Sequence, residues 1–191
     1  MPKVGMEPLR RAALVKATIH EIGRAQSLDV TVGQIARTAG MSSALAHHYF
    51  GGKTQIFLAA MRHILGQYGV EIRRALAQTD GPRARADAII TTSFADPFFE
   101  PATVAAWMTL YASANTNPET RQLLSVYHRR LRSNLVHALR PLTARPTQHA
   151  ETLAALIDGL YLRAALSEDG STEMAKQSAL DTLDLILKEA A

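Results

Sequence analysis

The sequence lacks cysteine altogether across its 191 residues. This absence excludes a disulfide-stabilised scaffold, a cysteine nucleophile and a zinc site with thiolate ligands. No apolar run approaches the roughly 20 residues that a membrane-spanning helix needs, and the first residues do not form the apolar segment of a signal peptide. We therefore expect a cytoplasmic protein that has no membrane partner.

Motifs of catalysis and metal binding are also missing. The chain contains no H-E-x-x-H, no P-loop, no G-x-G-x-x-G and no serine, histidine and aspartate pattern of a hydrolase. Seven histidines are scattered along the chain, and the adjacent pair His47 and His48 would point about 100° apart on a helix, which disfavours one shared metal ion. We predict no catalytic residues, no cofactor and no metal site; a helical enzyme is the alternative.

The net charge of +4 is concentrated near the N-terminus. Residues 1–54 contain seven Lys or Arg against three Asp or Glu, whereas the rest of the chain contains fourteen of each. A basic module attached to a neutral body indicates a polyanionic partner, of which nucleic acid is the commonest. Chance clustering of a few charges is the alternative explanation.

Apolar residues recur at helical spacing along nearly the whole chain, and no segment alternates as a strand would. In the first helix this spacing places Val15, Ile19 and Ile22 on the inner face. Prolines, glycines and capping residues divide the chain into segments. We predict an all-α protein with about nine helices, at residues 8–26, 32–39, 43–49, 53–78, 83–95, 101–115, 118–140, 147–168 and 171–190, the last two separated at Asp169-Gly170.

Residues 31–50 read T-V-G-Q-I-A-R-T-A-G-M-S-S-A-L-A-H-H-Y-F, which gives two short helices joined by a tight turn. Thr31 and Ser42 are suited to cap the two helices. Ala36 is small where the second helix would cross, and Gly40 supplies the positive φ that the turn requires. This is the pattern of a helix-turn-helix, in which the second helix lies in the major groove of DNA.

The exposed side of the second helix carries groups that can bind DNA. Hydroxyl and imidazole groups can bond base edges or phosphates, a small side chain allows close approach, and a lysine at the start of a helix favours a phosphate. The predicted DNA-contacting residues are Arg10, Arg11, Thr31, Ser42, Ser43, Ala44, Leu45, His47, His48, Tyr49 and Lys53. For Tyr49 and Phe50 a place in the core is the alternative, and Thr31 is a cap in either case.

The pattern T-V-x-x-I-A-x-x-A-G-M-S-S-A-x-x-x-H-Y-F-x-x-K over residues 31–53 resembles the signature of the TetR family of bacterial repressors. Residues 1–6, 10–11, 46–50, 105–107, 129–135 and 153–166 also resemble a choline-responsive branch of that family, which controls genes of glycine-betaine synthesis.

The resemblance implies a homodimer that binds a palindromic operator in double-stranded DNA. It implies a three-helix DNA-binding head at residues 1–53 and a larger effector-binding and dimerisation domain at 54–191, which dimerises through about 147–168 and 171–190. Choline is the implied effector. A regulator that senses a drug, a lipid or an acyl thioester is the alternative within the family, and a protein that only assembles through its last helices is the alternative outside it.

The choline effector is a quaternary ammonium without an N–H donor, so proteins bind it with aromatic faces and a nearby carboxylate. Aromatic residues make up only 6% of the chain. Trp107 and Tyr111 lie four residues apart on one helix, and Asp158 and Tyr161 lie three apart on another. We predict a cage of Trp107, Tyr111 and Tyr161 with Asp158 as the counter-charge. The alternative is that the rings are core residues and that Asp158 pairs with an arginine at 129–130 or lies at the dimer interface.

Overall fold

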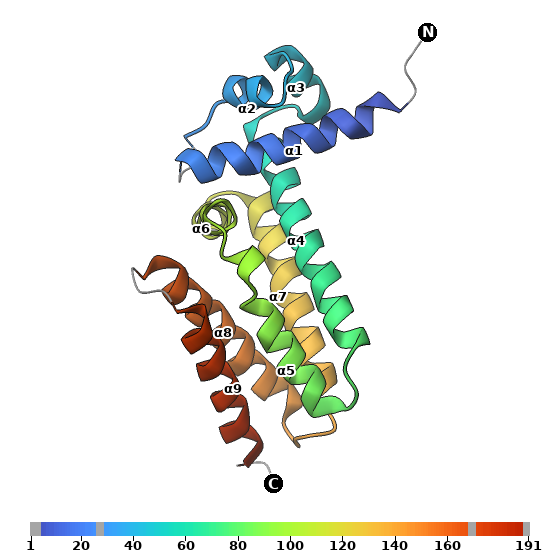
Figure 1. The fold of residues 1–191 in the computed structure, drawn as a ribbon, viewed down its shortest axis with the longest axis vertical. Coiled ribbons are helices and arrows are strands. Elements are labelled where there is room, and N and C mark those ends of the chain that lie inside the picture. The colour runs from blue at the N-terminus through green and yellow to red at the C-terminus, as the bar shows by residue number, and fades with distance from the viewer. Residues whose placement is uncertain (1–4, 26–28, 168–170, 189–191) are drawn as a thin grey trace. The chain divides into compact units, whose positions relative to one another are not determined.

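A computed structural model describes residues 5–25, 29–167 and 171–188. Within these ranges the chain forms nine α-helices and one short 3-10 helix, and contains no strand (Figure 1). The helices are α1 Met6–Ala25, α2 Val32–Thr38, α3 Ser43–Phe50, α4 Lys53–Ala77, α5 Pro82–Ser93, α6 Pro101–Ala114, α7 Pro118–Leu139, α8 Pro146–Leu166 and α9 Thr172–Lys188. The all-α prediction and its number of helices are confirmed.

The predicted boundaries agree with most of these helices to within two residues. The helix predicted to reach residue 95 instead ends at Ser93 and is followed by the 3-10 helix η1, Asp96–Phe98, which the spacing did not predict. The predicted end of the first helix at Gln26 and the break at Asp169-Gly170 lie outside the described residues.

The chain divides into two compact units, and each unit is built from two separate stretches of sequence. The first unit comprises Met1–Gly66 and Glu100–Leu124, and the second comprises Gln67–Phe99 and Ser125–Ala191. Helix α6 therefore clusters with α1, α2 and α3. The predicted functional boundary between residues 53 and 54 falls inside the first unit and stays a prediction.

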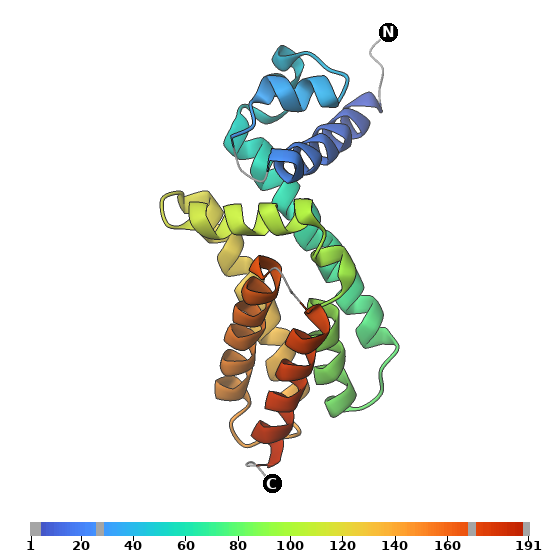
Figure 2. The ribbon, with the colours of Figure 1, turned by 60° about the vertical axis from the view of Figure 1, so that its left-hand side comes forward.

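In the first unit, α1 packs against α2 and α6 (Figures 1 and 2). Of the three residues predicted on the inner face of α1, Ile22 is buried as predicted, whereas Val15 and Ile19 are only half-buried and Leu14, which was not predicted there, is buried. A Cβ atom on Gly23 would lie 2.4 Å from the Cβ of Ala102 in α6. The two helices therefore approach so closely that only glycine fits at this position of α1.

In the second unit, α8 and α9 lie side by side and both contact α5 (Figure 2). Arg83 of α5 pairs with Asp87 at 2.9 Å on its own helix and with Asp184 of α9. These two carboxylates raise the pKa of the Arg83 guanidinium despite the opposing effect of desolvation. The ion pairs fix α5 against α9 beside an apolar core that includes Ile89, Leu153 and Leu183.

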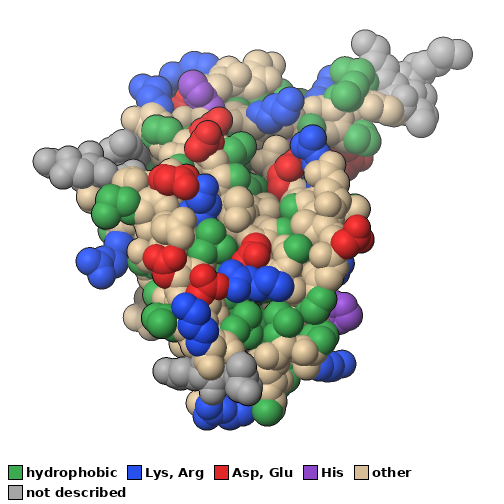
Figure 3. All heavy atoms as spheres, turned by 60° about the horizontal axis from the view of Figure 1, so that its bottom comes forward, with side chains coloured by type: hydrophobic (Ala, Val, Ile, Leu, Met, Phe, Trp, Pro, Cys, Tyr) green, Lys and Arg blue, Asp and Glu red, His purple; other side chains and the backbone are tan. Residues whose placement is uncertain are grey.

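The surface carries charges of both signs. On the face that Figure 3 shows, acidic and basic side chains lie next to one another among hydrophobic ones, so this face does not present a field of one sign. Across the described ranges, none of the helices combines the length and the apolar character that a membrane span requires.

Candidate DNA-binding and effector sites

The helix-turn-helix of α2 and α3 is held by the caps that the sequence predicts. The Thr31 hydroxyl accepts from the Gln34 backbone N–H at 3.1 Å, and the Gln34 side chain in turn accepts from the Thr31 backbone N–H at 2.7 Å. Ser42 caps α3 by accepting from the Leu45 backbone N–H at 3.2 Å. Gly40 has a φ of +67° at the turn between the helices. This local geometry confirms the predicted roles of Thr31, Gly40 and Ser42 in the backbone.

One face of α3 is exposed to solvent. Ser43, Ala44, His47 and His48 are exposed, Leu45 is half-buried, and Ala46 on the opposite face is buried. Residues at positions i, i+1, i+4 and i+5 lie along one side of a helix. The exposed face of α3 therefore presents hydroxyl and imidazole groups of the kinds that can bond base edges in a major groove.

The predicted contacts at the start of α1 take part in an internal cluster. Arg10 donates to the Tyr49 hydroxyl at 3.3 Å. Arg11 donates to Glu7 at 2.8 Å, and its guanidinium lies 5.1 Å from the centre of the Phe50 ring and 5.6 Å from that of Tyr49. Tyr49 and Phe50 are both half-buried. These contacts tie α1 to the end of α3, so a phosphate would have to compete with Glu7 for Arg11.

Lys53 is exposed at the first position of α4. It lines a small hollow of about 120 Å³ whose other walls come from α4, α6 and the start of α7, namely Thr54, Phe57, Ser113, Asn117 and Thr120. Gln55 donates to Glu119 at 2.6 Å beside it. The start of α4 is therefore attached to the turn between α6 and α7 within the first unit.

A buried carboxylate, Glu21, links α1 to the end of α2, and this link was not predicted from the sequence. It is 4% exposed, accepts from the Thr38 hydroxyl at 2.7 Å and accepts from Arg24 at 3.0 Å. The Thr38 hydrogen bond, followed by Arg24, lowers the pKa of Glu21 against the opposing effect of burial. Because Thr38 lies 17 positions along the chain, no local pattern could have indicated this link between α1 and the end of α2.

Of the predicted effector residues, Trp107 and Tyr111 lie in the first unit. Both are on α6, and their rings are stacked with centroids 5.9 Å apart and planes inclined by 29°. Trp107 is buried and Tyr111 is half-buried. The prediction that they share one face of a helix is confirmed.

Asp158 lies on α8 in the second unit, with 20% of its side chain exposed. One carboxylate oxygen accepts from the Tyr127 hydroxyl at 2.8 Å, and the other lies 3.3 Å from Nε2 of His128. Both partners come from α7. The arginines at 129–130, which the sequence offered as alternative partners, are instead exposed.

Two side chains that contact this carboxylate, Tyr127 and His128, belong to a larger group of aromatic residues in the second unit. The Asp158 cluster is defined as Asp158 with Tyr68, Phe98, Phe99, Tyr127, His128 and Tyr161. The Tyr161 hydroxyl donates to the Phe98 carbonyl at 2.7 Å, and its ring centroid lies 4.7 Å from that of Phe99. The Tyr68 ring lies 6.0 Å from Tyr127 and 5.3 Å from Phe98.

Burial raises the pKa of Tyr68 to about 12, with a further contribution from the Asp158 charge, and burial also raises the pKa of Tyr161. Tyr68, Phe98, Phe99 and Tyr127 were absent from the predicted site. The scarcity of aromatic residues was a usable signal for them, but their gathering from α4, η1 and α7 depends on tertiary structure.

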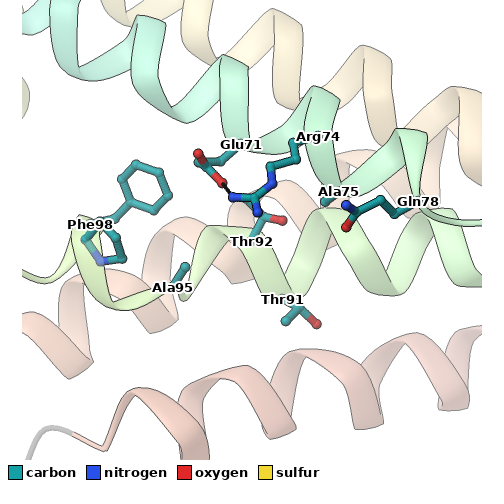
Figure 4. A pocket seen from close by; sticks show the side chains of 9 residues that line it. Glu71, Arg74, Ala75, Gln78, Thr91, Thr92, Ala95 and Phe98 are labelled. Atoms are coloured by element: carbon teal, nitrogen blue, oxygen red, sulfur yellow. Dashed lines mark ion pairs between the residues drawn. The ribbon is translucent and has the colours of Figure 1, made fainter.

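A second hollow, of about 320 Å³, lies in the same unit between α4, α5 and η1 (Figure 4). Glu71 and Arg74 line it and pair with each other at 3.7 Å. Phe98 forms part of its wall as well as part of the Asp158 cluster. Within the described ranges, no three His, Asp or Glu side chains are grouped closely enough to hold a metal ion.

An all-α fold with a helix-turn-helix and a separate helical unit is typical of DNA-binding regulators. Residues 14–60 match the family model of bacterial regulatory proteins of the tetR family. Residues 82–188 match the model of the C-terminal part of BetI-type transcriptional repressors. The chain therefore belongs to the TetR family and, within it, to the BetI-type repressors.

Close relatives agree with this placement. The chain is 53% identical over 171 residues to the HTH-type transcriptional regulator BetI of Brucella anthropi, and this alignment covers 88% of each protein. It is 47% identical over 192 residues to the regulator of the same name from Agrobacterium fabrum, covering 98% of this chain and 93% of that one. The protein is thus a transcriptional regulator and not an enzyme.

Solved structures share the fold. A transcriptional regulator from Pseudomonas aeruginosa PAO1 superposes with a TM-score of 0.83 at 24% identity, over 95% of this chain and 91% of that one. A regulator from Saccharomonospora viridis, solved in complex with choline, gives a TM-score of 0.82 at 21% identity, over 91% of this chain and 95% of that one.

Proposed function

We propose that this BetI-type repressor binds a palindromic operator as a homodimer and that choline lowers its affinity for that operator. Its target genes are those for glycine-betaine synthesis, and it acts in the cytoplasm because its operator lies there. The observation that carries the choline proposal is the Asp158 carboxylate, which accepts from the Tyr127 hydroxyl at 2.8 Å, the Tyr127 ring in turn lying 6.0 Å from that of Tyr68.

On the DNA side, we propose that residues 1–53 form the functional head and that the exposed face of α3 enters the major groove. Arg10, Arg11 and Lys53 supply positive charge near the backbone, and the N-terminus of α2 behind Thr31 offers backbone N–H groups. Two copies of α3 would read half-sites about one helical turn, roughly 34 Å, apart. A gel-shift with the DNA upstream of its own gene tests this, and failure to bind any such fragment would contradict it.

For the dimer, support comes from exposed apolar side chains on the last two helices. Leu166 at the end of α8 is 70% exposed, and Met174 and Leu185 on α9 are 73% and 60% exposed. Because these three side chains lie on two helices that pack side by side, they are candidates for burial against a second copy of the chain.

The dimer is tested by sedimentation of Met174→Glu and Leu185→Glu. We expect both variants to sediment as monomers and to lose operator affinity. Val70→Glu is the matched control. The Val70 side chain on α4 is likewise exposed, at 51%, but lies outside α8 and α9, so this variant should stay dimeric. A wild-type monomer, or dimeric Met174→Glu and Leu185→Glu variants, would contradict the proposed interface.

The choline response follows from the chemistry of the Asp158 cluster. A quaternary ammonium gains about 0.5–2 kcal/mol from each aromatic face and more from a partly desolvated carboxylate. The regulator from Saccharomonospora viridis, which has the same fold, was solved with choline bound. Trp107 and Tyr111, which stack on each other on α6, stay predicted effector-binding residues and are tested separately.

Calorimetric titration with choline tests the effector. We expect Asp158→Asn to weaken choline binding about tenfold or more, because the amide keeps the shape of the carboxylate but loses its charge. Glu151→Gln, which alters an exposed carboxylate on the same helix, should bind choline like wild type. The carbon isostere of choline, with a quaternary carbon in place of nitrogen, should bind wild type poorly.

Other outcomes would redirect the proposal. Absence of choline binding by wild type, together with binding of a neutral lipid or drug, would favour a different effector. Equal affinity of wild type and Trp107→Ala or Tyr111→Ala would remove that residue from the cage.

A further inference from the structure

The His47 imidazole on the exposed face of α3 is fixed by a hydrogen bond to the end of its own helix. Its Nδ1 lies 3.0 Å from the carbonyl oxygen of Gly51. A carbonyl oxygen only accepts, so Nδ1 must carry the hydrogen and donate it. The same pair of residues makes a second contact, because the Gly51 backbone N–H donates to the His47 carbonyl at 2.7 Å.

Glycine makes this arrangement possible. Gly51 ends α3 with a φ of +82°, a conformation that residues with a side chain rarely adopt. That turn brings the Gly51 carbonyl back toward the His47 ring. The ring is therefore held in one orientation and one tautomer before any DNA arrives, so binding costs it little side-chain entropy.

A fixed tautomer decides what the exposed edge of the ring can bind. With the imidazole neutral and its hydrogen on Nδ1, Nε2 is an acceptor only. Phosphate oxygens, guanine O6 and N7, and thymine O4 are acceptors too, so none of them can pair with Nε2. The donors in the major groove are the amino groups of adenine N6 and cytosine N4.

We propose that His47 is a specificity-determining residue that accepts a hydrogen bond from an amino base, adenine or cytosine, at one position of each operator half-site. It discriminates against the keto bases guanine and thymine at the same position in the contacted strand. This inference rests on the proposed contact between α3 and the major groove and is independent of the identity of the effector.

The first experiment selects binding sites from a random DNA pool at about pH 8, above the ordinary pKa of a histidine side chain. Wild type should prefer adenine or cytosine at one position per half-site by about two- to tenfold, the value of one net hydrogen bond. His47→Ala should lose that preference and keep the others. His47→Arg, which only donates, should reverse it toward guanine.

A control variant and DNA that carries a modified base test whether any effect is specific to His47 and to the amino group of the base. His63→Ala, which removes an exposed histidine from α4, should select the same sites as wild type. If wild type prefers adenine, replacing that base by purine, which lacks the amino group, should weaken wild type about two- to tenfold and leave His47→Ala unchanged. If it prefers cytosine, a pyrimidine analogue without the 4-amino group takes its place.

Three results would overturn the inference. Wild type could prefer a keto base at the position that His47→Ala changes, His47→Ala could change no position, or removal of the amino group could weaken both proteins equally. If His47→Ala proves unfolded by circular dichroism, the reversed preference of His47→Arg is the deciding result. If wild type selects no sequence at all, the proposed operator binding fails, and this outcome is distinct from a failed assignment of His47.

Discussion

Replacing Gly23 by alanine tests how closely α1 and α6 pack in the first unit. The new Cβ would lie 2.4 Å from the Cβ of Ala102, 2.7 Å from its Cα and 3.2 Å from its backbone nitrogen. Two of these atoms belong to the backbone of α6, so no side-chain rotation can relieve the overlap. The helices must separate, and contacts along the whole crossing weaken with them.

Two opposing effects determine how far Gly23→Ala changes the free energy of unfolding. Overpacking of a tight contact costs about 1–3 kcal/mol, whereas alanine gains up to about 1 kcal/mol over glycine inside a helix. Because the obstacle is backbone, we expect the cost to prevail and the free energy of unfolding to fall by about 1–2 kcal/mol. For a chain of this length that lowers the melting temperature by roughly 2–8 °C.

Gly66→Ala provides the matched control. Gly66 also lies inside a helix, α4, but a Cβ there would meet no atom within 4 Å. We expect this variant to gain about 0.5–1 kcal/mol from helix propensity alone. Calorimetric melting of both variants measures the contrast in sign. If Gly23→Ala melts at or above the wild-type temperature, the α1–α6 crossing is not the tight contact described above.

Three further predictions concern the head. Glu21→Gln should destabilise the protein near neutral pH, and the difference from wild type should shrink as the pH falls through the lowered pKa of Glu21, since its stabilisation is present only above that pKa; urea melts over a pH series measure this, and a constant difference would refute it. Thr31→Ala removes the capping box with Gln34 and should cost about 1 kcal/mol, measured in the same melts; an unchanged midpoint would contradict the cap. Operator affinity should fall about a thousandfold between roughly 50 and 200 mM salt, measured by fluorescence anisotropy; a flat response would argue against phosphate contacts.

The positions of the helices could be predicted because their signals are local. Thr31, Gly40 and Ser42 each act on backbone groups within four residues, so their roles can be inferred from sequence spacing alone. The inner face of α1 could not be predicted equally well. A rule that places apolar residues inside cannot anticipate that Glu21 is buried, since its partner Thr38 is brought close only by the packing of α1 against α2.

The predicted effector-binding residues show the same limit of local sequence patterns. The i, i+4 spacing predicts that Trp107 and Tyr111 share one face of a helix, and they do, with their rings stacked. The spacing of Asp158 and Tyr161 likewise predicts that both lie on one helix, but it does not indicate that Tyr127 and His128 of α7 hold the carboxylate. A hydrogen bond across 31 residues depends on the packing of two helices, which no pattern within either helix encodes.

The charge of the Asp158 cluster gives different expectations for the effectors that the sequence left open. With their pKa values raised by burial, the phenols of Tyr68 and Tyr161 stay neutral near pH 7. The negative charge of the cluster therefore comes from Asp158, whose carboxylate Tyr127 holds at 2.8 Å. An acyl thioester that carries phosphate groups would meet this charge with charges of its own sign, and a neutral lipid would gain only from the rings. A quaternary ammonium would gain from both the rings and the carboxylate, so under the proposed function we expect charge rather than size to decide which effector binds at this cluster.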